Sequence, residues 1–166
     1  MRIAILGDTH SRYQTVQSAL QILREKEINL VIHYGDIDDA DTVRLFDGFT
    51  THFVFGNSDW DKAALRQAMQ ETGATLHEAF GNLEIKGVTI AWTHGDDKRL
   101  LRDLENSQHY DFLFYGHTHQ REQHKSGKTV VANPGALHRA RPKTFNILDL
   151  DSRTLETVEV LVESRS

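Results

Sequence analysis

Five short apolar runs, each closed by a loop that carries Asp, Asn or His, constrain the fold of this chain more than any other feature. Apolar runs of four to six residues that end in glycine-containing loops are typical of buried strands. Ligands in open α/β sheets bind beyond the carboxyl ends of the strands, so we expect these polar loops to gather at one edge. The runs cover residues 2–6, 30–33, 52–55, 88–92 and 112–115.

The spacing of apolar residues between and after these runs changes from helical to mostly β along the chain. Helices are predicted over Tyr13–Glu27, Thr42–Phe49, Trp60–Thr72 and Lys98–Glu105. Further strands are predicted over Thr75–His77, Asn82–Ile85, Arg121–His124, Thr129–Ala132, Thr144–Leu150 and Thr154–Val162. Asp39 or Asp41 is the expected N-cap of the second helix and Asp59 that of the third. This order favours an α/β fold with two packed sheets, helices outside, and largely parallel strands in the first half.

The length of 166 residues fits a single domain over residues 1–166. The chain contains no cysteine, so oxygen and imidazole nitrogen must hold any bound metal. A formal net charge of −5 and the lack of an extended basic stripe argue against a nucleic-acid polymer as partner. The first residues contain no cleavage signal and no apolar stretch approaches membrane length, so we expect a cytoplasmic protein without a membrane partner.

The polar loops offer two carboxylates, one amide and four imidazoles. This mixture of donors suits Mn²⁺, Fe, Ni²⁺ or Zn²⁺. Seven ligands exceed what one ion normally takes and suit two ions that share a bridge. The loops are Gly7-Asp8-Thr9-His10, Gly35-Asp36, Gly56-Asn57-Ser58-Asp59, Thr93-His94-Gly95 and Gly116-His117-Thr118-His119.

In this order the motifs resemble those of the calcineurin-like metallophosphoesterases. The compact length and Asn133-Pro134-Gly135 after the last motif resemble the YfcE-like subfamily of small phosphodiesterases. The motifs span Asp8 to His119, and the similar layout extends over nearly the whole chain. The resemblance implies a metallophosphoesterase-type two-sheet β-sandwich flanked by helices. It also implies a first metal site of Asp8, His10 and His119, a second of Asn57, His94 and His117, and a bridging Asp36.

The implied activity is hydrolysis of a small phosphodiester by a hydroxide that bridges two divalent ions. Mn²⁺ is the expected ion, with Ni²⁺, Fe or Zn²⁺ as alternatives, and the predicted catalytic residues are Asp36, Asn57 and His94. Many members of the superfamily carry a histidine after the asparagine of the third motif, which is thought to assist the leaving group. Ser58 occupies that position here, and the YfcE-like subfamily shares this lack. Because a serine hydroxyl is a weak acid, we expect diesters with acidic leaving groups to react best.

Other interpretations remain open at this stage. The enzyme alternative is a phosphomonoesterase acting on nucleotides or sugar phosphates, and the non-enzyme alternative is an interaction scaffold of the same fold, as in the retromer coat. A scaffold would be free to lose ligands, whereas all seven are kept here. The late β-rich region offers an edge for a homo-oligomer, which the sequence does not decide.

Several residues outside the motifs have competing interpretations. Arg139, in the only basic cluster, either binds a substrate phosphate or lies in a solvated turn. Trp60 either stacks on a base or aryl ring or, as we favour, covers the core. Asp59 is expected to be a helix cap or a group behind the ligands. The remaining histidines are assigned core or surface roles: His33, His52, His77, His109, His124 and His138.

Overall fold

The computed structural model describes residues 1–162 and contains the helices and strands that the spacing predicts. The four helices are α1 (Tyr13–Glu25), α2 (Ala40–Leu45), α3 (Lys62–Thr72) and α4 (Lys98–Ser107). The first six strands are β1 (Arg2–Leu6), β2 (Leu30–His33), β3 (Thr50–Phe53), β4 (Thr75–Leu76), β5 (Phe80–Ile85) and β6 (Val88–Thr93). The last five are β7 (Phe112–Phe114), β8 (Glu122–Ser126), β9 (Thr129–Asn133), β10 (Thr144–Asp149) and β11 (Thr154–Glu159).

The strands form two mixed sheets. The six-stranded sheet has the order β11-β10-β1-β2-β3-β4, in which β1 to β4 run parallel and β10 and β11 are antiparallel additions. The five-stranded sheet has the order β5-β6-β7-β9-β8, and β6, β7 and β9 are parallel. The first sheet therefore has antiparallel pairing at one side only, and the second has it at both edges. In both sheets, polar loops follow the carboxyl ends of parallel strands.

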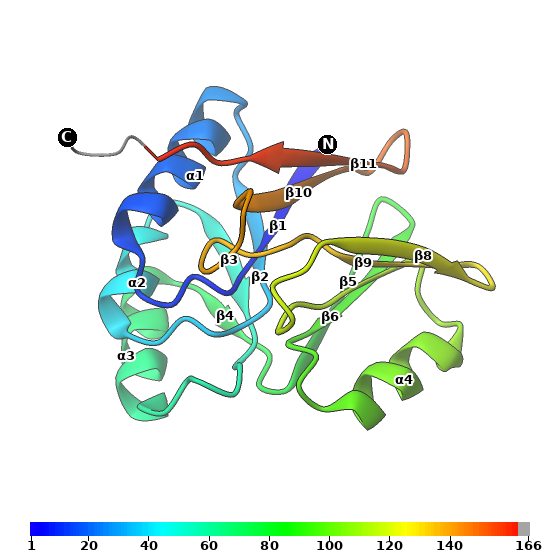
Figure 1. Cartoon of the computed structure of the whole chain (residues 1–166), viewed down its shortest axis with the longest axis horizontal. Coiled ribbons are helices and arrows are strands. Elements are labelled where there is room, and N and C mark those ends of the chain that lie inside the picture. Colours follow the sequence, from blue (N-terminus) through cyan, green and yellow to red (C-terminus); the bar gives the residue numbers. More distant parts are fainter. Residues whose placement is uncertain (163–166) are drawn as a thin grey trace.

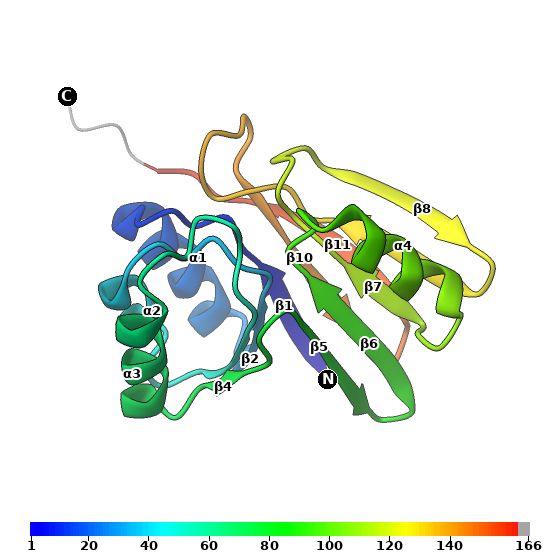
Figure 2. The ribbon, with the colours of Figure 1, turned by 90° about the horizontal axis from the view of Figure 1, so that it is seen from below.

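The two sheets pack face to face, with α1, α2 and α3 outside the first and α4 outside the second (Figures 1 and 2). Ile5, Tyr34, Trp92 and Phe114 are fully buried members of the cluster between the sheets. One further cluster lies under α1–α3 and a smaller one lies under α4. These layers confirm the predicted α/β architecture of two packed sheets flanked by helices. Within residues 1–162 no helix is long and apolar enough to cross a membrane.

The predicted start of α3 is wrong by two residues. Asp61, not Asp59, accepts the N–H of Ala64 and caps the helix, which begins at Lys62. The Asp59 carboxylate is 2% exposed and binds other backbone amides. Trp60, expected to cover the core, is 87% exposed instead, in the loop between β3 and α3. At α2 one of the two expected caps is confirmed, since Asp39 accepts the N–H of Thr42.

Candidate metal centre

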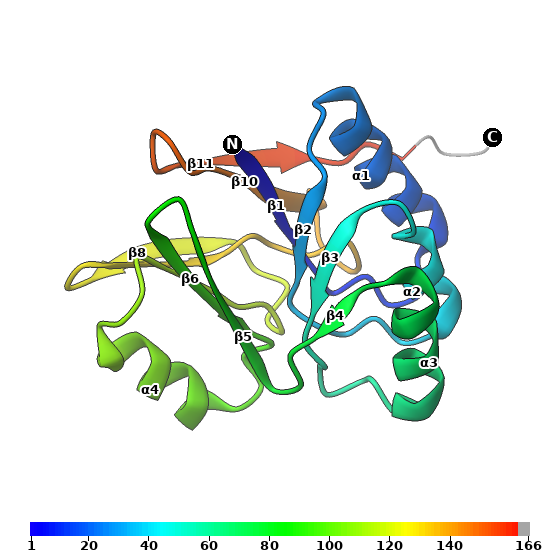
Figure 3. The same cartoon turned by 180° about the vertical axis from the view of Figure 1, so that it is seen from behind.

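The seven predicted ligands lie on loops that leave the carboxyl ends of parallel strands in both sheets. The loops after β1, β2 and β3 come from the first sheet, and those after β6 and β7 come from the second, which faces it (Figure 3). The two sheets thus contribute to one cluster, since His94 on the second contacts Asp36 on the first. This geometry follows from the apolar runs, because each run ends where its polar loop begins.

The backbone is strained at most of the candidate ligands. Asp8, His10, Asp36, His117 and His119 have φ values of 46°, 42°, 58°, 72° and 59°. Residues with a side chain rarely adopt this left-handed region, and each such residue costs about 1–3 kcal/mol. The surrounding fold therefore holds the backbone of five of the seven candidate ligands in this costly conformation. Such strain is often concentrated where side chains must be aimed at a ligand.

The first group of candidate ligands is compact. Asp8, His10, Asp36 and His119 each offer a ligand atom, and these atoms lie within 4.8 Å of one another. The His10 Nε2 atom lies 3.2 Å from Asp36 Oδ2, and the His119 Nε2 atom lies 3.5 Å from Asp8 Oδ1. Asp8 is fully buried and Asp36 is 3% exposed, so both carboxylates are held in a setting that favours pairing with a cation.

The second group of candidate ligands also contacts Asp36. The His94 Nε2 atom is 3.2 Å from the same Asp36 Oδ2 atom that His10 approaches. The His117 Nδ1 atom is 3.0 Å from Asn57 Oδ1, and the rings of His94 and His117 are 5.3 Å apart. One oxygen of Asp36 therefore lies between the two groups.

Hydrogen bonds behind the cluster fix the orientation of its side chains. The His94 Nδ1 atom donates to the carbonyl of Tyr34 at 2.9 Å, which leaves the lone pair of Nε2 directed toward Asp36. The His10 Nδ1 atom contacts Asp38 at 3.2 Å in the same manner. Asp38 belongs to none of the predicted ligand sets, so its contact with the candidate ligand His10 was not predicted from the sequence.

Asp59 connects two of the ligand-bearing loops. Its Oδ1 atom accepts the N–H groups of Ile37 and Asp38, each at 2.8 Å. Its Oδ2 atom accepts those of Asp36 at 3.0 Å and Gly56 at 2.7 Å. The four amides come from the loops after β2 and β3, so one buried carboxylate holds Asp36 and the backbone next to Asn57 in a fixed relation. Asp59 was expected to be either a helix cap or a group behind the ligands. The structure places it behind the candidate ligands.

The cluster contains buried oxygen and nitrogen atoms without hydrogen-bond partners, as a site that binds a metal would. Among the described residues, the Asp8 Oδ1, His10 Nε2 and His94 Nε2 atoms are buried and make no hydrogen bond, despite their closeness to other polar atoms. An unpaired buried polar atom is costly, so three within one cluster require an explanation. Carboxylate oxygen and imidazole nitrogen suit borderline divalent ions. The residues therefore fit a divalent metal.

The electrostatics of the cluster also favour a bound cation. Burial alone would raise the pKa of Asp36, but the contacts with His10 and His94 outweigh burial and hold that pKa well below its ordinary value. Burial would lower the pKa of His94, yet the contact with Asp36 and the charge of Asp8 raise it to about 9. Both shifts show that this cluster stabilises positive charge beside Asp36, which protons or a metal can supply.

An open pocket of about 400 Å³ gives access to the cluster. His10, Asp36, Asn57, His117 and His119 line it together with three basic or imidazole side chains, Arg12, His138 and Arg139. Arg139 thus lines the same pocket as the candidate ligands, which binding of a substrate phosphate by Arg139 would require.

His138 was assigned a core or surface role, but it lines this pocket with its ring 4.9 Å from that of His10. Arg12 Nε donates to His138 Nδ1 at 3.0 Å, so the remaining ring nitrogen of a neutral His138 carries the proton. Burial and the nearby positive groups lower the pKa of His138 to about 4. Neither Arg12 nor His138 belongs to a motif or a run, so spacing alone offered no signal for them.

The side chains of His33, His52 and His77 contact groups other than the candidate ligand atoms. His33 is fully buried, where its Nδ1 accepts the N–H of Gly35 and its Nε2 contacts the hydroxyl of Thr9. His52 and His77 contact each other, with His52 Nδ1 and His77 Nε2 2.9 Å apart.

Comparison with known proteins agrees with this geometry. A family model described as the calcineurin-like phosphoesterase superfamily domain matches residues 1–153. A phosphodiesterase of Methanocaldococcus jannaschii is 27% identical over 168 residues, which cover 98% of this chain and 100% of the relative. The solved structure of an archaeal phosphodiesterase has a TM-score of 0.89 and 25% identity, covering 96% of this chain and 100% of that one. YfcE, a phosphoesterase from E. coli, shares the fold with a TM-score of 0.70 at 17% identity, covering 97% of this chain and 100% of that one.

Two packed sheets with carboxylates and imidazoles gathered at their common edge define a metal-dependent hydrolase. The chain belongs to the calcineurin-like phosphoesterase superfamily. It is a phosphoric ester hydrolase, as the resemblance implied.

Proposed function

We propose that this chain is a phosphodiesterase that hydrolyses small phosphodiesters with two divalent ions at the seven-residue cluster. The observation that supports the proposal best is the position of Asp36. Its Oδ2 atom lies 3.2 Å from a nitrogen of His10 in one group and 3.2 Å from a nitrogen of His94 in the other. A carboxylate placed between two sets of donors is suited to bridge two ions.

The chain's residues would divide the work as follows. Asp8, His10 and His119 would hold one ion, and Asn57, His94 and His117 the other, with Asp36 shared. A bound pair of divalent ions supplies a water acidic enough to act as hydroxide near neutral pH and positive charge that offsets charge developing on the phosphate. Asn57, as a neutral ligand, adds no negative charge and so leaves the site attractive to an anionic substrate. Mn²⁺ is the proposed ion.

The basic side of the pocket would bind the phosphate oxygens. Arg139 and Arg12 line the pocket beside His10 and His119, where a guanidinium can donate two parallel hydrogen bonds to a phosphate. His138 would donate its remaining N–H, because Arg12 fixes the proton on that nitrogen. These groups bind and orient the phosphate without transferring a proton.

Ser58 would contribute little to departure of the leaving group. Its hydroxyl donates to Asp38 Oδ1 at 2.5 Å, and its backbone N–H donates to Asp36 Oδ1 at 3.0 Å. The side chain is thus engaged in holding the loop. We therefore expect aryl diesters, whose leaving groups need no proton, to react much faster than alkyl diesters. Equal rates on the two, with chemistry rate-limiting, would contradict this part of the proposal.

The test is metal content together with hydrolysis. The purified chain, dialysed against Mn²⁺, should retain about two equivalents of metal and hydrolyse bis(p-nitrophenyl) phosphate. Asp36→Asn and His94→Ala should each lower both the metal content and the rate. His109→Ala is the matched control, because His109 is exposed and lies outside the pocket.

The outcomes separate the alternatives. One equivalent of metal with full activity would overturn the dinuclear mechanism. Faster hydrolysis of p-nitrophenyl phosphate than of the diester would favour a phosphomonoesterase. Two equivalents of metal without hydrolysis of either ester would favour the scaffold. A homo-oligomer stays a prediction that sedimentation of the same preparation would test.

A further inference from the structure

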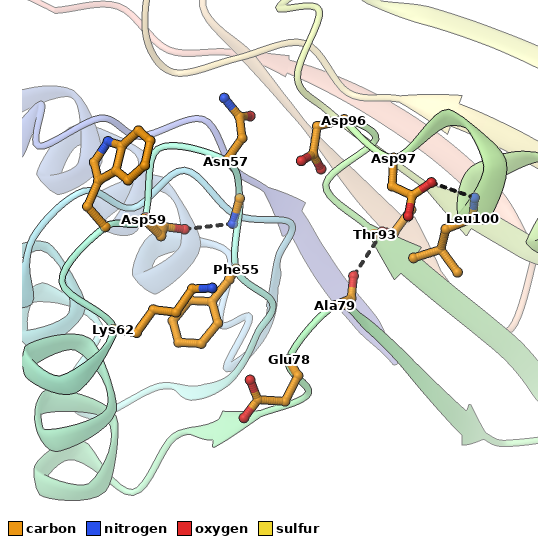
Figure 4. A pocket seen from close by; sticks show the side chains of 12 residues that line it. Phe55, Asn57, Asp59, Lys62, Glu78, Ala79, Thr93, Asp96, Asp97 and Leu100 are labelled. Carbon is orange, nitrogen blue, oxygen red and sulfur yellow. Dashed lines mark hydrogen bonds between the residues drawn. The ribbon is translucent and has the colours of Figure 1, made fainter.

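A second pocket adjoins the metal centre. It has a volume of about 510 Å³ and lies between the loop that joins β3 to α3 and the loop that joins β6 to α4 (Figure 4). We call it the side pocket; its lining includes Phe55, Asn57, Trp60, Lys62, Asp96 and Leu100. Asn57 lines both pockets, and Thr93 in the side pocket directly precedes His94. A substrate whose phosphate is held at the metal centre can therefore extend into the side pocket.

Most polar groups of the side pocket are already engaged. Asp59 accepts backbone amides, and Asp97 accepts the N–H of Leu100 at 3.0 Å as the cap of α4. Glu78 pairs with both terminal nitrogens of Arg66. Among the described residues, the exposed carboxylate of Asp96 makes no hydrogen bond, and Figure 4 shows it across the pocket from Phe55. Asp96 is thus the acceptor that remains available to a ligand.

The charge of the lining selects against an anionic ligand. Four carboxylates line the pocket with one ammonium group, that of Lys62, and even with Glu78 neutralised by Arg66 the acidic groups outnumber the basic one. The Lys62 Nζ atom also lies 5.4 Å from the centre of the Phe55 ring, so part of its charge is directed at the ring. A second phosphate or a carboxylate would be repelled here. The lining therefore accepts a neutral or a cationic group, and a nucleobase with N–H donors is of the neutral kind.

The remaining surface is flat and apolar. Trp60 is 87% exposed, although a tryptophan in a globular protein is ordinarily well buried. Leu100 lies across the pocket from the largely buried Phe55, and both contribute apolar surface to the lining (Figure 4). An exposed indole and an unpaired carboxylate that line the same pocket suit a planar ring that carries N–H donors.

We propose that the side pocket binds the nucleobase of a nucleoside phosphodiester, stacked on Trp60 and donating an N–H to Asp96. This inference rests on the proposed function, because the phosphate must be held at the metal centre for the base to reach the side pocket. It narrows the substrate class from small phosphodiesters to those with a neutral, planar heterocycle on one ester group.

Calorimetry of the Mn²⁺-loaded chain with two ligands that differ only in the base tests the proposal. Adenosine 5′-monophosphate and ribose 5-phosphate present the same phosphate and sugar, and only the first carries a base. We expect the nucleotide to bind about tenfold or more tightly, as base–aromatic stacking predicts. In Trp60→Ala this preference should be lost, in Trp60→Phe it should be largely kept, and Asp96→Asn should reduce it. Phe80→Ala, which removes an exposed aromatic outside the side pocket, should keep it.

The outcomes distinguish this inference from the function on which it rests. Equal affinity for the two ligands, or an unchanged preference in Trp60→Ala, would overturn the side pocket as a base site while leaving the metal centre intact. Binding of neither ligand, together with no hydrolysis of bis(p-nitrophenyl) phosphate, would refute the proposed function itself. A Trp60→Ala protein that fails to fold would show equally low binding of ribose 5-phosphate, and Trp60→Phe then decides.

Discussion

Gly56→Ala tests whether close backbone packing positions the metal centre. A Cβ atom at Gly56 would lie 2.1 Å from Asp36 Oδ1 and 2.4 Å from the Asp36 backbone nitrogen. Ordinary contact begins at 3.4 Å, so Oδ1 would have to retreat by about 1.3 Å. The backbone nitrogen cannot retreat easily, because its N–H is bound to Asp59. The substitution must therefore displace the side chain that lies between the two ligand groups.

The expected cost has two parts. Overpacking costs about 1–3 kcal/mol, and losing the charge-assisted bond from the Ser58 amide to Asp36 costs about 1.5–3 kcal/mol. A loss of about 4 kcal/mol in the free energy of unfolding is expected, which corresponds to a fall in Tm of roughly 10 °C for a chain of this size. Urea unfolding in EDTA measures the stability, and Mn²⁺ calorimetry measures the effect on metal binding.

Gly73→Ala is the matched control. Gly73 follows α3 with a φ of 71°, and an added Cβ there meets nothing within 4 Å. The left-handed backbone alone should cost about 1–2 kcal/mol, with Mn²⁺ binding unchanged. If Gly56→Ala is no less stable than Gly73→Ala and binds Mn²⁺ as the original chain does, the steric reasoning is refuted.

Three further outcomes are expected. His138→Ala should raise KM for bis(p-nitrophenyl) phosphate with metal content unchanged, because it removes a phosphate donor and no ligand; a fall in metal content would contradict this. His52, whose pKa is lowered to about 4 by burial and then by His77, binds a proton more readily when unfolded. Its contribution to stability should therefore fall as the pH drops from about 6.5 through 4, and the urea midpoint of the original chain should drop more over this range than that of His52→Gln. Removal of metal by EDTA should lower Tm, since Asp8 and Asp36 then lose their cation; an unchanged Tm would argue against bound metal.

Much of the fold could be predicted because the apolar runs and their loops follow simple periods. The turn between Ile85 and Val88 is an example, since Lys86 and Gly87 adopt the positive φ values that a tight hairpin needs. The start of α3 could not be predicted as well, because Asp59 and Asp61 are equally good caps in sequence. Only the tertiary packing of the β2 loop, which offers backbone amides to Asp59, decides between them.

In the candidate metal centre, too, some residues could be predicted from the sequence and others could not. Asp36 and His94 could be located in advance because each lies in a loop that follows a parallel strand. His138 and Arg12 could not, because they are 126 residues apart and become neighbours only when the loop after β9 folds over the start of α1. The exposure of Trp60 was also hidden, since an aromatic residue beside a strand is ordinarily part of the core.

The division of the candidate ligands between two facing sheets gives the interior of the sandwich a second role. Residues such as Ile5 and Trp92, which are buried in the cluster between the sheets, act as spacers that set how far His94 lies from Asp36. Substituting them with larger or smaller residues would shift the candidate ligands of one sheet relative to those of the other. The separation of the two proposed ions could thus be adjusted from the hydrophobic interior without altering a single candidate ligand.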